Sequence, residues 1–355
     1  MNHPKIKDYR HISTVMETAK MQMDKVRSGQ LKPLFTASKK ETEKIGGLYP
    51  GDQVVIAGRT GTGKSALVTQ YMAEFVDPTI NPYYVDKLII LVDSYEMADW
   101  RVAMRMISSK GEIEAKALLD YNQRLTEERF AMLKNIADSF KNYPIYVSTY
   151  PLSVKKWEES KKNIAAQFPH HYIVNIQDHS RLVLKENEAK EEELITNLML
   201  AGVRLKNNHQ MINIFLSQMN RAIETGVARG QQGKELPIAS DIFGSDAVFQ
   251  CAEIVIALHR PGIYGLEEFR GYPTGKIASD PTAQDNLFIE CILKQRDGEL
   301  ANMMMMHNLK YNKIVDYPEI TSKINNKQIP ANFKPITQTG SGWDQVEQPF
   351  NNGNW

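Results

Sequence analysis

The stretch from Gly51 to Ser65, GDQVVIAGRTGTGKS, constrains the fold of this chain more than any other feature. Residues 54–57 form a short apolar run between turn signals, which is typical of a buried strand. Residues 58–65, GRTGTGKS, fit the pattern G-x-x-x-x-G-K-[ST], and residues 66–75 predict a helix. Strand, glycine-rich loop and helix follow one another in the order of a phosphate-binding loop (P-loop). The sequence therefore predicts that the chain binds a nucleoside triphosphate.

The residue types in this loop suit phosphate chemistry. Glycine lets backbone N–H groups close around the β-phosphate, and the positive end of the following helix favours the same anion. Lys64 can reach the β- and γ-phosphates, and the Ser65 hydroxyl can ligate Mg²⁺. A glycine-rich turn that matches by chance is the alternative, which the flanking strand and helix disfavour. The expected nucleotide contacts are Gly58, Arg59, Thr60, Gly61, Thr62, Gly63, Lys64, Ser65 and Ala66.

The composition limits the classes of protein to which this chain can belong. A hydrophobic content of 42% and a charged content of 24% over 355 residues predict a soluble globular chain with a sizeable core. Because the formal net charge is only +1, any nucleic-acid contact must come from a local patch. Cys251 and Cys291 lie in apolar, strand-like runs without zinc spacing, which favours a reducing compartment. No long apolar span or signal peptide is evident, so we expect a cytoplasmic protein with no membrane partner.

The order of predicted elements gives the fold class. Strands and helices alternate through the first two thirds of the chain, and strands alone follow. This order predicts an α/β fold, a mainly parallel twisted sheet with helices on both faces and antiparallel strands at the C-terminal end. Residues 34–57 are predicted to be a β-rich approach to the P-loop strand. The later strands are expected at 87–92, 145–148, 172–176, 212–216, 251–258, 287–293 and 303–306, and the later helices at 93–110, 125–140, 154–167 and 188–207.

The two ends of the chain differ from this central domain. Apolar residues recur at helical spacing near the N-terminus, at Ile12, Val15, Met16, Ala19, Met23 and Val26. Such a helix packs either on its own domain or on a neighbouring subunit. The tail is rich in Asn, Gln, Gly and Pro, which is typical of disorder. We therefore expect an arm at 1–32, an ATPase domain at 33–325 and a disordered tail at 326–355.

Carboxylates at two strand ends are candidates for chemistry. Asp178 ends the apolar run YIVNIQD, where a carboxylate can hold Mg²⁺ beside Ser65. Glu96 lies just after the strand at 87–92, where a carboxylate could polarise an attacking water. Asp93 competes for that role, and helix N-terminal capping is the alternative reading of both.

Polar residues follow two further strands. Gln218 ends the run INIFLSQ, where it could sense the γ-phosphate or could simply bind backbone. Lys294 and Arg296 follow the run FIECIL, and in a ring they could reach the γ-phosphate of an adjacent subunit. A solvated turn is the alternative there, since Asp297-Gly298 is a hairpin signal.

A long loop at 222–240 adds candidate nucleic-acid contacts. It is rich in glycine, and loops of this length are usually functional or disordered. Arg221, Arg229 and Lys234 could contact phosphates, although a solvated loop would carry the same residues.

The chain carries an ordered set of motifs that resembles a known set. In order they are GRTGTGKS, SYEM with RVAMRMIS, the Asp178 strand, LSQMNR, SDIFGSDAVFQCAEIVIALHR and KQRDG. Over about residues 33–320 the chain resembles the RecA-like motor domain of DnaB-type (superfamily 4) replicative helicases, including phage relatives. SYEM matches the family's S-L-E-M, LSQMNR its L-S-Q-L-N-R, and KQRDG its K-Q-R-N-G.

The resemblance implies a function. Members form hexameric rings around single-stranded DNA, hydrolyse ATP or another nucleoside triphosphate with Mg²⁺ between subunits, and translocate 5′–3′. By that resemblance Lys64 and Ser65 bind phosphate and Mg²⁺, Asp178 is the metal carboxylate and Glu96 the catalytic base. Gln218 is the γ-phosphate sensor, and Lys294 and Arg296 act in trans. The helix at 12–26 is similar to the family's linker helix, which docks on the neighbouring subunit. A helicase loader, a primase or a polymerase are further partners to test.

The sequence departs from the family in ways that bear on DNA contact. The family's D-L-R-E-S-G loop reads DIFGSD at 241–246, with Phe243, Gly244 and Ser245 at the positions where DNA contact is expected. We find no counterpart of the family's helical N-terminal domain, which suggests a diverged, phage-like member that works in a bacterial host cytoplasm. Two rival hypotheses are a recombinase that forms filaments on DNA and a regulatory RecA-like ATPase that moves no DNA. The first would normally carry an aromatic polymerisation motif, which we do not find.

Overall fold

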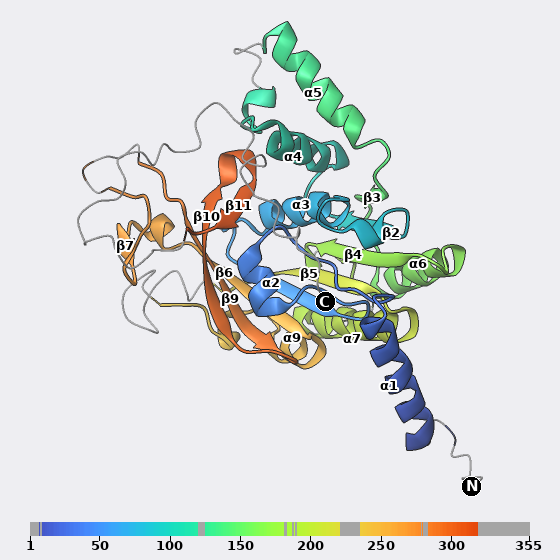
Figure 1. Ribbon diagram of the computed structural model, residues 1–355. Helices are drawn as coiled ribbons and strands as arrows, with labels where there is room; N and C mark the ends of the chain where they lie inside the picture. The colour runs from blue at the N-terminus through green and yellow to red at the C-terminus, as the bar shows by residue number, and fades with distance from the viewer. Residues whose placement is uncertain are drawn as a thin grey trace. The chain divides into compact units, whose positions relative to one another are not determined.

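A nine-stranded sheet runs through the domain, with helices on both of its faces (Figure 1). The computed structural model describes residues 7, 9–119, 125–180, 183–186, 188, 190–220, 235–277, 279 and 283–318. The predicted tail, 326–355, lies outside these residues. The strand order is β11-β10-β9-β6-β1-β5-β4-β2-β3, and β7 and β8 form a separate two-stranded sheet.

The strands are β1 (Gln53–Gly58), β2 (Leu88–Ser94), β3 (Ile145–Ser148), β4 (Tyr172–Asp178), β5 (Ile212–Gln218), β6 (Ile254–His259), β7 (Glu268–Phe269), β8 (Tyr272–Pro273), β9 (Leu287–Gln295), β10 (Ala301–Asn308) and β11 (Lys313–Asp316). The α-helices are α1 (Ile12–Arg27), α2 (Lys39–Ile45), α3 (Lys64–Phe75), α4 (Asp99–Gly111), α5 (Glu127–Ser139), α6 (Val154–Gln167), α7 (Glu191–His209) and α9 (Ser245–Cys251). Short 3₁₀ helices span Pro82–Tyr84, Ala117–Leu119, Ala239–Asp241, Pro261–Tyr264 and Leu309–Tyr311.

The sheet is parallel on one side of β6 and antiparallel on the other. From β6 through β1, β5, β4 and β2 to β3, every neighbouring pair is parallel. The pairs β6–β9, β9–β10 and β10–β11 are antiparallel. The predicted α/β fold, a mainly parallel sheet with antiparallel C-terminal strands, is therefore confirmed.

Strand β1, which leads into the P-loop, lies in the interior of this sheet and contributes side chains to two hydrophobic cores. Val54 and Ile56 pack in the cluster that includes side chains of α3 and α4. Val55 and Ala57 pack on the opposite face, with side chains of α6 and α7. Figure 1 shows α3 and α4 above the sheet and α7 and α9 below it. Because alternate residues of β1 face opposite cores and every one is buried, the carboxyl end of β1 is held rigidly.

Two expectations about secondary structure were wrong. The approach at 34–57 is not continuously β-rich, because α2 interrupts it; Ser38 caps the helix by accepting from the Glu41 N–H, and Gly46 ends it at φ 80°. Cys251 is not in a strand but is the last residue of α9, and β6 begins at Ile254. The run is apolar in both elements because both are buried, so apolarity alone did not distinguish helix from strand.

The N-terminal helix α1 carries the apolar residues that the sequence pattern singled out. None of its side chains is buried, and Ile12, Met16 and Met23 are 59%, 55% and 69% exposed. On the described residues of this chain, the apolar face of α1 is therefore uncovered.

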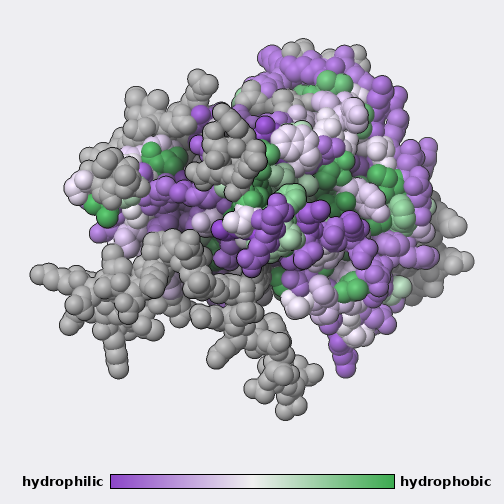
Figure 2. Space-filling view, turned by 90° about the horizontal axis from the view of Figure 1, so that it is seen from above, coloured by the Kyte–Doolittle hydropathy of each residue, from purple (hydrophilic) through white to green (hydrophobic). Residues whose placement is uncertain are grey.

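Seen from above, from the side on which α4 and α5 lie, the surface carries small groups of apolar side chains between broader hydrophilic areas (Figure 2). Within the described ranges, no helix combines the length and the apolar character that crossing a bilayer requires.

Candidate functional site

The P-loop joins β1 to α3 and depends on glycine at three positions. Gly61 and Gly63 have φ values of +80° and +109°, which other residues rarely adopt. Gly58 is needed for space, since a Cβ there would lie 2.5 Å from Thr62 Oγ1. The Thr62 hydroxyl donates to the Arg59 carbonyl at 2.7 Å and closes the loop on itself. The predicted nucleotide-binding residues 58–66 thus run from the last residue of β1 through a tight turn into the first residues of α3.

Lys64 is buried against the loop that it serves. Its Nζ donates to the carbonyl oxygens of Gly58 at 2.8 Å and Arg59 at 3.2 Å. Burial lowers the pKa of Lys64 to about 8, and the charges of Asp178 and Glu96 oppose that shift. An anion bound in the loop would restore the charge that burial disfavours.

Ser65 and Asp178 meet although they are far apart in the sequence. The Ser65 hydroxyl donates to Asp178 Oδ2 at 3.1 Å. Burial raises the pKa of Asp178, and Glu96 raises it further, while the Ser65 hydrogen bond and the Lys64 and Arg105 charges lower it. A hydroxyl and a carboxylate oxygen side by side are hard donors that suit Mg²⁺. The described residues hold no cluster of three or more His, Cys, Asp or Glu side chains able to bind a metal.

Glu96 lies on the loop that joins β2 to α4, beside Asp178. Ser94, the last residue of β2, is in register with Asp178, and the Tyr95 N–H donates to the Asp178 carbonyl at 2.7 Å. Glu96 lines a cleft of about 890 Å³ together with Ser65 and Arg105. The side chain is exposed, so a water or a phosphate can approach it.

Asp93, the competing carboxylate, is directed elsewhere. Its Oδ2 accepts from Trp157 Nε1 at 2.9 Å and pairs with Lys161 Nζ at 2.7 Å, and it is only 2% exposed. These contacts bind α6 to the sheet. Asp93 is therefore a structural carboxylate, and Glu96 is the one that faces the candidate phosphate site.

Gln218 lies next to the P-loop and next to the diverged 241–246 segment. It is in parallel register with Gly58, and Arg59 Nη1 donates to the neighbouring Met219 carbonyl at 2.8 Å. The Gln218 carbonyl accepts from the Phe243 N–H at 3.1 Å. A change at the end of β5 can therefore reach the 241–246 segment through one hydrogen bond.

The candidate DNA contacts are only partly described. Phe243 is half-buried and packs against the core below the sheet. Gly244 has φ +66° and precedes α9, whose first residue is Ser245. Arg221, Arg229 and Lys234 lie outside the described residues.

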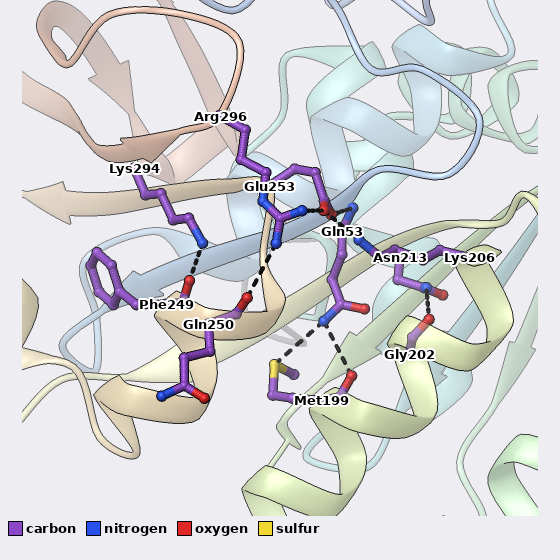
Figure 3. A network of polar contacts seen from close by, with 10 residues as sticks. All are labelled: Gln53, Met199, Gly202, Lys206, Asn213, Phe249, Gln250, Glu253, Lys294 and Arg296. Atoms are coloured by element: carbon purple, nitrogen blue, oxygen red, sulfur yellow. Dashed lines mark hydrogen bonds and ion pairs between the residues drawn. The ribbon is translucent and has the colours of Figure 1, made fainter. Parts of the chain in front are cut away.

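Lys294 and Arg296 are tied to the end of α9 (Figure 3). Lys294 Nζ donates to the Phe249 carbonyl, and Arg296 Nη2 donates to the Gln250 carbonyl at 3.2 Å. Arg296 Nη1 also pairs with Glu253 Oε1 at 3.1 Å. Glu253 in turn accepts from the Gln53 N–H at 2.8 Å and from Lys206 Nζ.

The strand registers set these two cations far from the P-loop of their own chain. Gln295 is opposite Ile254, the first residue of β6, whereas the P-loop follows the last residue of β1. The parallel strands are about 20 Å long at ~3.3 Å per residue, so the two groups occupy opposite edges of the sheet. Lys294 and Arg296 cannot complete this chain's own phosphate site.

Two residues that the sequence analysis did not single out also touch the site. Arg105 lines the cleft with Glu96, and burial lowers its pKa. Arg260 follows β6, and its Nη1 donates to the Gly61 carbonyl at 2.5 Å. Its place directly after an apolar strand is the same signal that identified Asp178, Gln218 and Glu96.

The chain matches a family model described as "DnaB-like helicase C terminal domain" over residues 33–316. Among characterised relatives, it is 25% identical over 299 residues to the replicative DNA helicase DnaC of Bacillus subtilis, covering 82% of this chain and 58% of the relative. It is 24% identical over 310 residues to the replicative DNA helicase DnaB of Geobacillus stearothermophilus, covering 86% and 60%. The chain thus spans about three fifths of the length of these relatives.

Solved structures share the fold. A structure described as an ATPase domain superposes with a TM-score of 0.71 at 18% identity, covering 88% of this chain and 100% of that one. A DnaB-like replicative helicase whose description also mentions its interactions with primase gives a TM-score of 0.69 at 18% identity, covering 88% and 68%.

Proposed function

Because this chain belongs to the family of DnaB-like helicase C-terminal domains, we propose that it is the ATP-hydrolysing motor of a replicative DNA helicase. The observation that carries the proposal is the distribution of the candidate catalytic groups over two edges of the sheet. Lys64, Ser65, Asp178 and Glu96 gather at the carboxyl ends of the parallel strands, and Lys294 and Arg296 lie at the opposite edge. Such a chain needs a second copy to complete each site.

The chain's own residues would bind the nucleotide and prepare the attack. Lys64 binds the β- and γ-phosphates, while the loop N–H groups hold the β-phosphate. Ser65 and Asp178 would hold Mg²⁺, which would supply positive charge to neutralise the phosphates. Glu96 orients a water for attack on the γ-phosphate and accepts its proton.

We further propose that the conformational change that follows hydrolysis is transmitted to the DNA through β5. Gln218 senses the γ-phosphate, and its backbone contact to Phe243 supports transmission to the 241–246 segment. The Lys294 and Arg296 contacts to α9, which begins at Ser245 within that segment, give the neighbouring subunit's site a second path to it.

The proposed assembly is a hexameric ring that translocates 5′–3′ on single-stranded DNA. The uncovered apolar face of α1 supports docking on a neighbouring subunit. A regulatory ATPase that moves no DNA is the second candidate function. The half-buried Phe243 favours it, because this ring packs into the core at a position where the family carries an arginine.

The test is unwinding of forked DNA with ATP, comparing substrates that carry only a 5′ or only a 3′ single-stranded tail. The helicase proposal predicts unwinding that requires the 5′ tail and is lost in Lys64→Ala. Hydrolysis that DNA neither stimulates nor couples to unwinding, even after the chain is preassembled on DNA, would favour the regulatory ATPase. Electron microscopy on single-stranded DNA separates closed rings from recombinase-like filaments.

A further inference from the structure

Arg260 joins the P-loop to a buried pair of side chains on the antiparallel side of the sheet. Besides donating to the Gly61 carbonyl, its guanidinium forms two hydrogen bonds with Asp285, Nε to Oδ2 at 3.0 Å and Nη2 to Oδ1 at 3.1 Å. The Arg260 and Asp285 side chains are each 11% exposed. A forked, two-point contact fixes the plane of the guanidinium as well as its position.

Asp285 is itself held from the other side by His307 of β10. His307 Nε2 lies 3.1 Å from Asp285 Oδ2, and the imidazole is 3% exposed. Since the carboxylate can only accept, Nε2 carries the proton and donates. Burial lowers the pKa of His307. Burial by itself would raise the pKa of Asp285, but the His307 hydrogen bond and the Arg260 charge together lower it. The pair is thus neutral imidazole and ionised carboxylate at neutral pH.

Gly262 leaves the room that the Asp285 side chain needs. A Cβ on Gly262 would lie 2.2 Å from Asp285 Cβ, which no flexible side-chain end could relieve. The φ of Gly262 is not in the left-handed region, so space rather than backbone conformation requires glycine there.

We propose that Asp285 and His307 are positioning residues for nucleotide binding: they hold Arg260 so that its guanidinium keeps the Gly61 carbonyl turned away from the phosphate space. The P-loop binds phosphate through its N–H groups, and a carbonyl that rotated inward would present negative charge to the anion. On the opposite side, Arg59 of the loop itself donates to the Met219 carbonyl just after β5, so one arginine contact holds the loop on each side of β1. This inference rests on the proposed nucleotide-binding function.

Loss of the Arg260 contact should affect nucleotide binding rather than the hydrolysis step. Lys64 is held by the Gly58 and Arg59 carbonyls, and Ser65 is held by Asp178 at the end of β4. The loop that carries Glu96 is fixed by the register of β2 with β4. Losing the brace should therefore weaken nucleotide affinity while a saturated site still turns over.

The experiment measures the dissociation constant of a fluorescent, non-hydrolysable ATP analogue and, separately, kcat at saturating ATP. We expect Asp285→Asn and Arg260→Gln each to raise the dissociation constant about tenfold, as expected for loss of a charge-assisted contact, with kcat within about twofold of wild type. If Arg260 acts only while Asp285 holds it, the double variant will bind no more weakly than Arg260→Gln. Glu158→Gln is the matched control, because it breaks a similar two-point pair with Arg204 between α6 and α7.

An unchanged dissociation constant in Asp285→Asn, effects that multiply in the double variant, or an equal loss in Glu158→Gln would each overturn the inference. If Asp285→Asn does not fold, His307→Gln decides, with an expected rise of about threefold at unchanged kcat. Failure of the wild-type chain to bind the analogue would instead refute the proposed nucleotide-binding function. The two failures are therefore distinguishable.

Discussion

Lys64 shows how a single buried residue couples the P-loop to pH. Its ammonium lies among backbone carbonyls that hydrogen-bond it without cancelling its charge, and burial lowers its pKa to about 8. A bound phosphate supplies the missing countercharge and raises that pKa again. Nucleotide binding above pH 8 therefore requires the uptake of a proton.

We expect nucleotide affinity to be constant below pH 8 and to fall above it, by up to about tenfold per pH unit. The sign follows because the charged lysine is the form that binds, and the free site loses that charge as the pH rises through about 8. Titration of the fluorescent analogue from about pH 7 to about pH 10 measures the effect. Lys64→Ala should bind weakly with a flat profile and should not hydrolyse ATP; a profile as steep as that of wild type would show that another group titrates.

Glu96 and Asp93 offer a matched pair of carboxylates. We expect Glu96→Gln to keep nucleotide binding and to lose turnover by roughly 10²–10⁴-fold, because only the proton acceptor is removed. Asp93→Asn should instead destabilise the fold, because it leaves the buried Lys161 charge unpaired. ATPase assays and urea unfolding of both variants check this. Normal turnover in Glu96→Gln would remove it from the mechanism.

At the scale of elements, α2 is joined to the P-loop helix by buried carboxyl groups. Tyr71 on α3 donates to Glu41 Oε1 at 2.7 Å, and Glu74 accepts from the Ala37 N–H at 3.0 Å and from Gln70 Nε2 at 2.7 Å. Burial raises the pKa of Glu41, and it raises the pKa of Glu74 to about 8. The segment ahead of β1 is thus held by carboxyl groups that bind protons more tightly in the folded chain.

The raised pKa of Glu74 has a definite sign for stability. Its contribution is fully present below the unfolded pKa near 4.5 and is lost as the pH rises toward the folded value of about 8. We expect wild type to lose on the order of 1–3 kcal/mol of unfolding free energy between about pH 5 and about pH 8 through this group. Glu74→Gln should lose less, as measured by urea unfolding at both pH values. Parallel pH profiles for the two proteins would contradict the assignment.

At the scale of the whole molecule, the sheet separates the groups that one reaction would need. The P-loop and Glu96 lie at the carboxyl ends of the parallel strands, and Arg296 lies at their amino ends, beside Glu253. One subunit can present both edges, each to a different neighbour, which is the geometry of a head-to-tail ring.

Mixing of inactive subunits tests this geometry. We expect Arg296→Ala to bind nucleotide without turnover, and Lys64→Ala to bind nucleotide weakly and to lose turnover. Mixed in different ratios, the two should recover part of the ATPase activity, because a Lys64→Ala subunit still offers an intact Arg296 to its neighbour. The control mixes Arg296→Ala with a double variant that combines Lys64→Ala and Glu253→Gln. In that variant Arg296 has lost its partner carboxylate, so it should rescue less. No recovery at any ratio would count against a shared site.

The sequence by itself determined the parts of this protein that local chemistry specifies. The P-loop, the alternation of strands and helices, and the polar residues that end β4 and β5 all follow from residue type and short-range periodicity. Local patterns also misled, since the buried run at Cys251 is as apolar in a helix as in a strand.

Only the tertiary structure decided which of these residues meet. Glu96 rather than Asp93 faces the candidate phosphate site, because Lys161 and Trp157 of α6 bind the Asp93 carboxylate. The Arg260–Asp285–His307 brace and the opposite placement of Arg296 depend on strand registers between β6, β9 and β10. Register is set by the packing of whole faces against one another, and no short window of sequence contains that information.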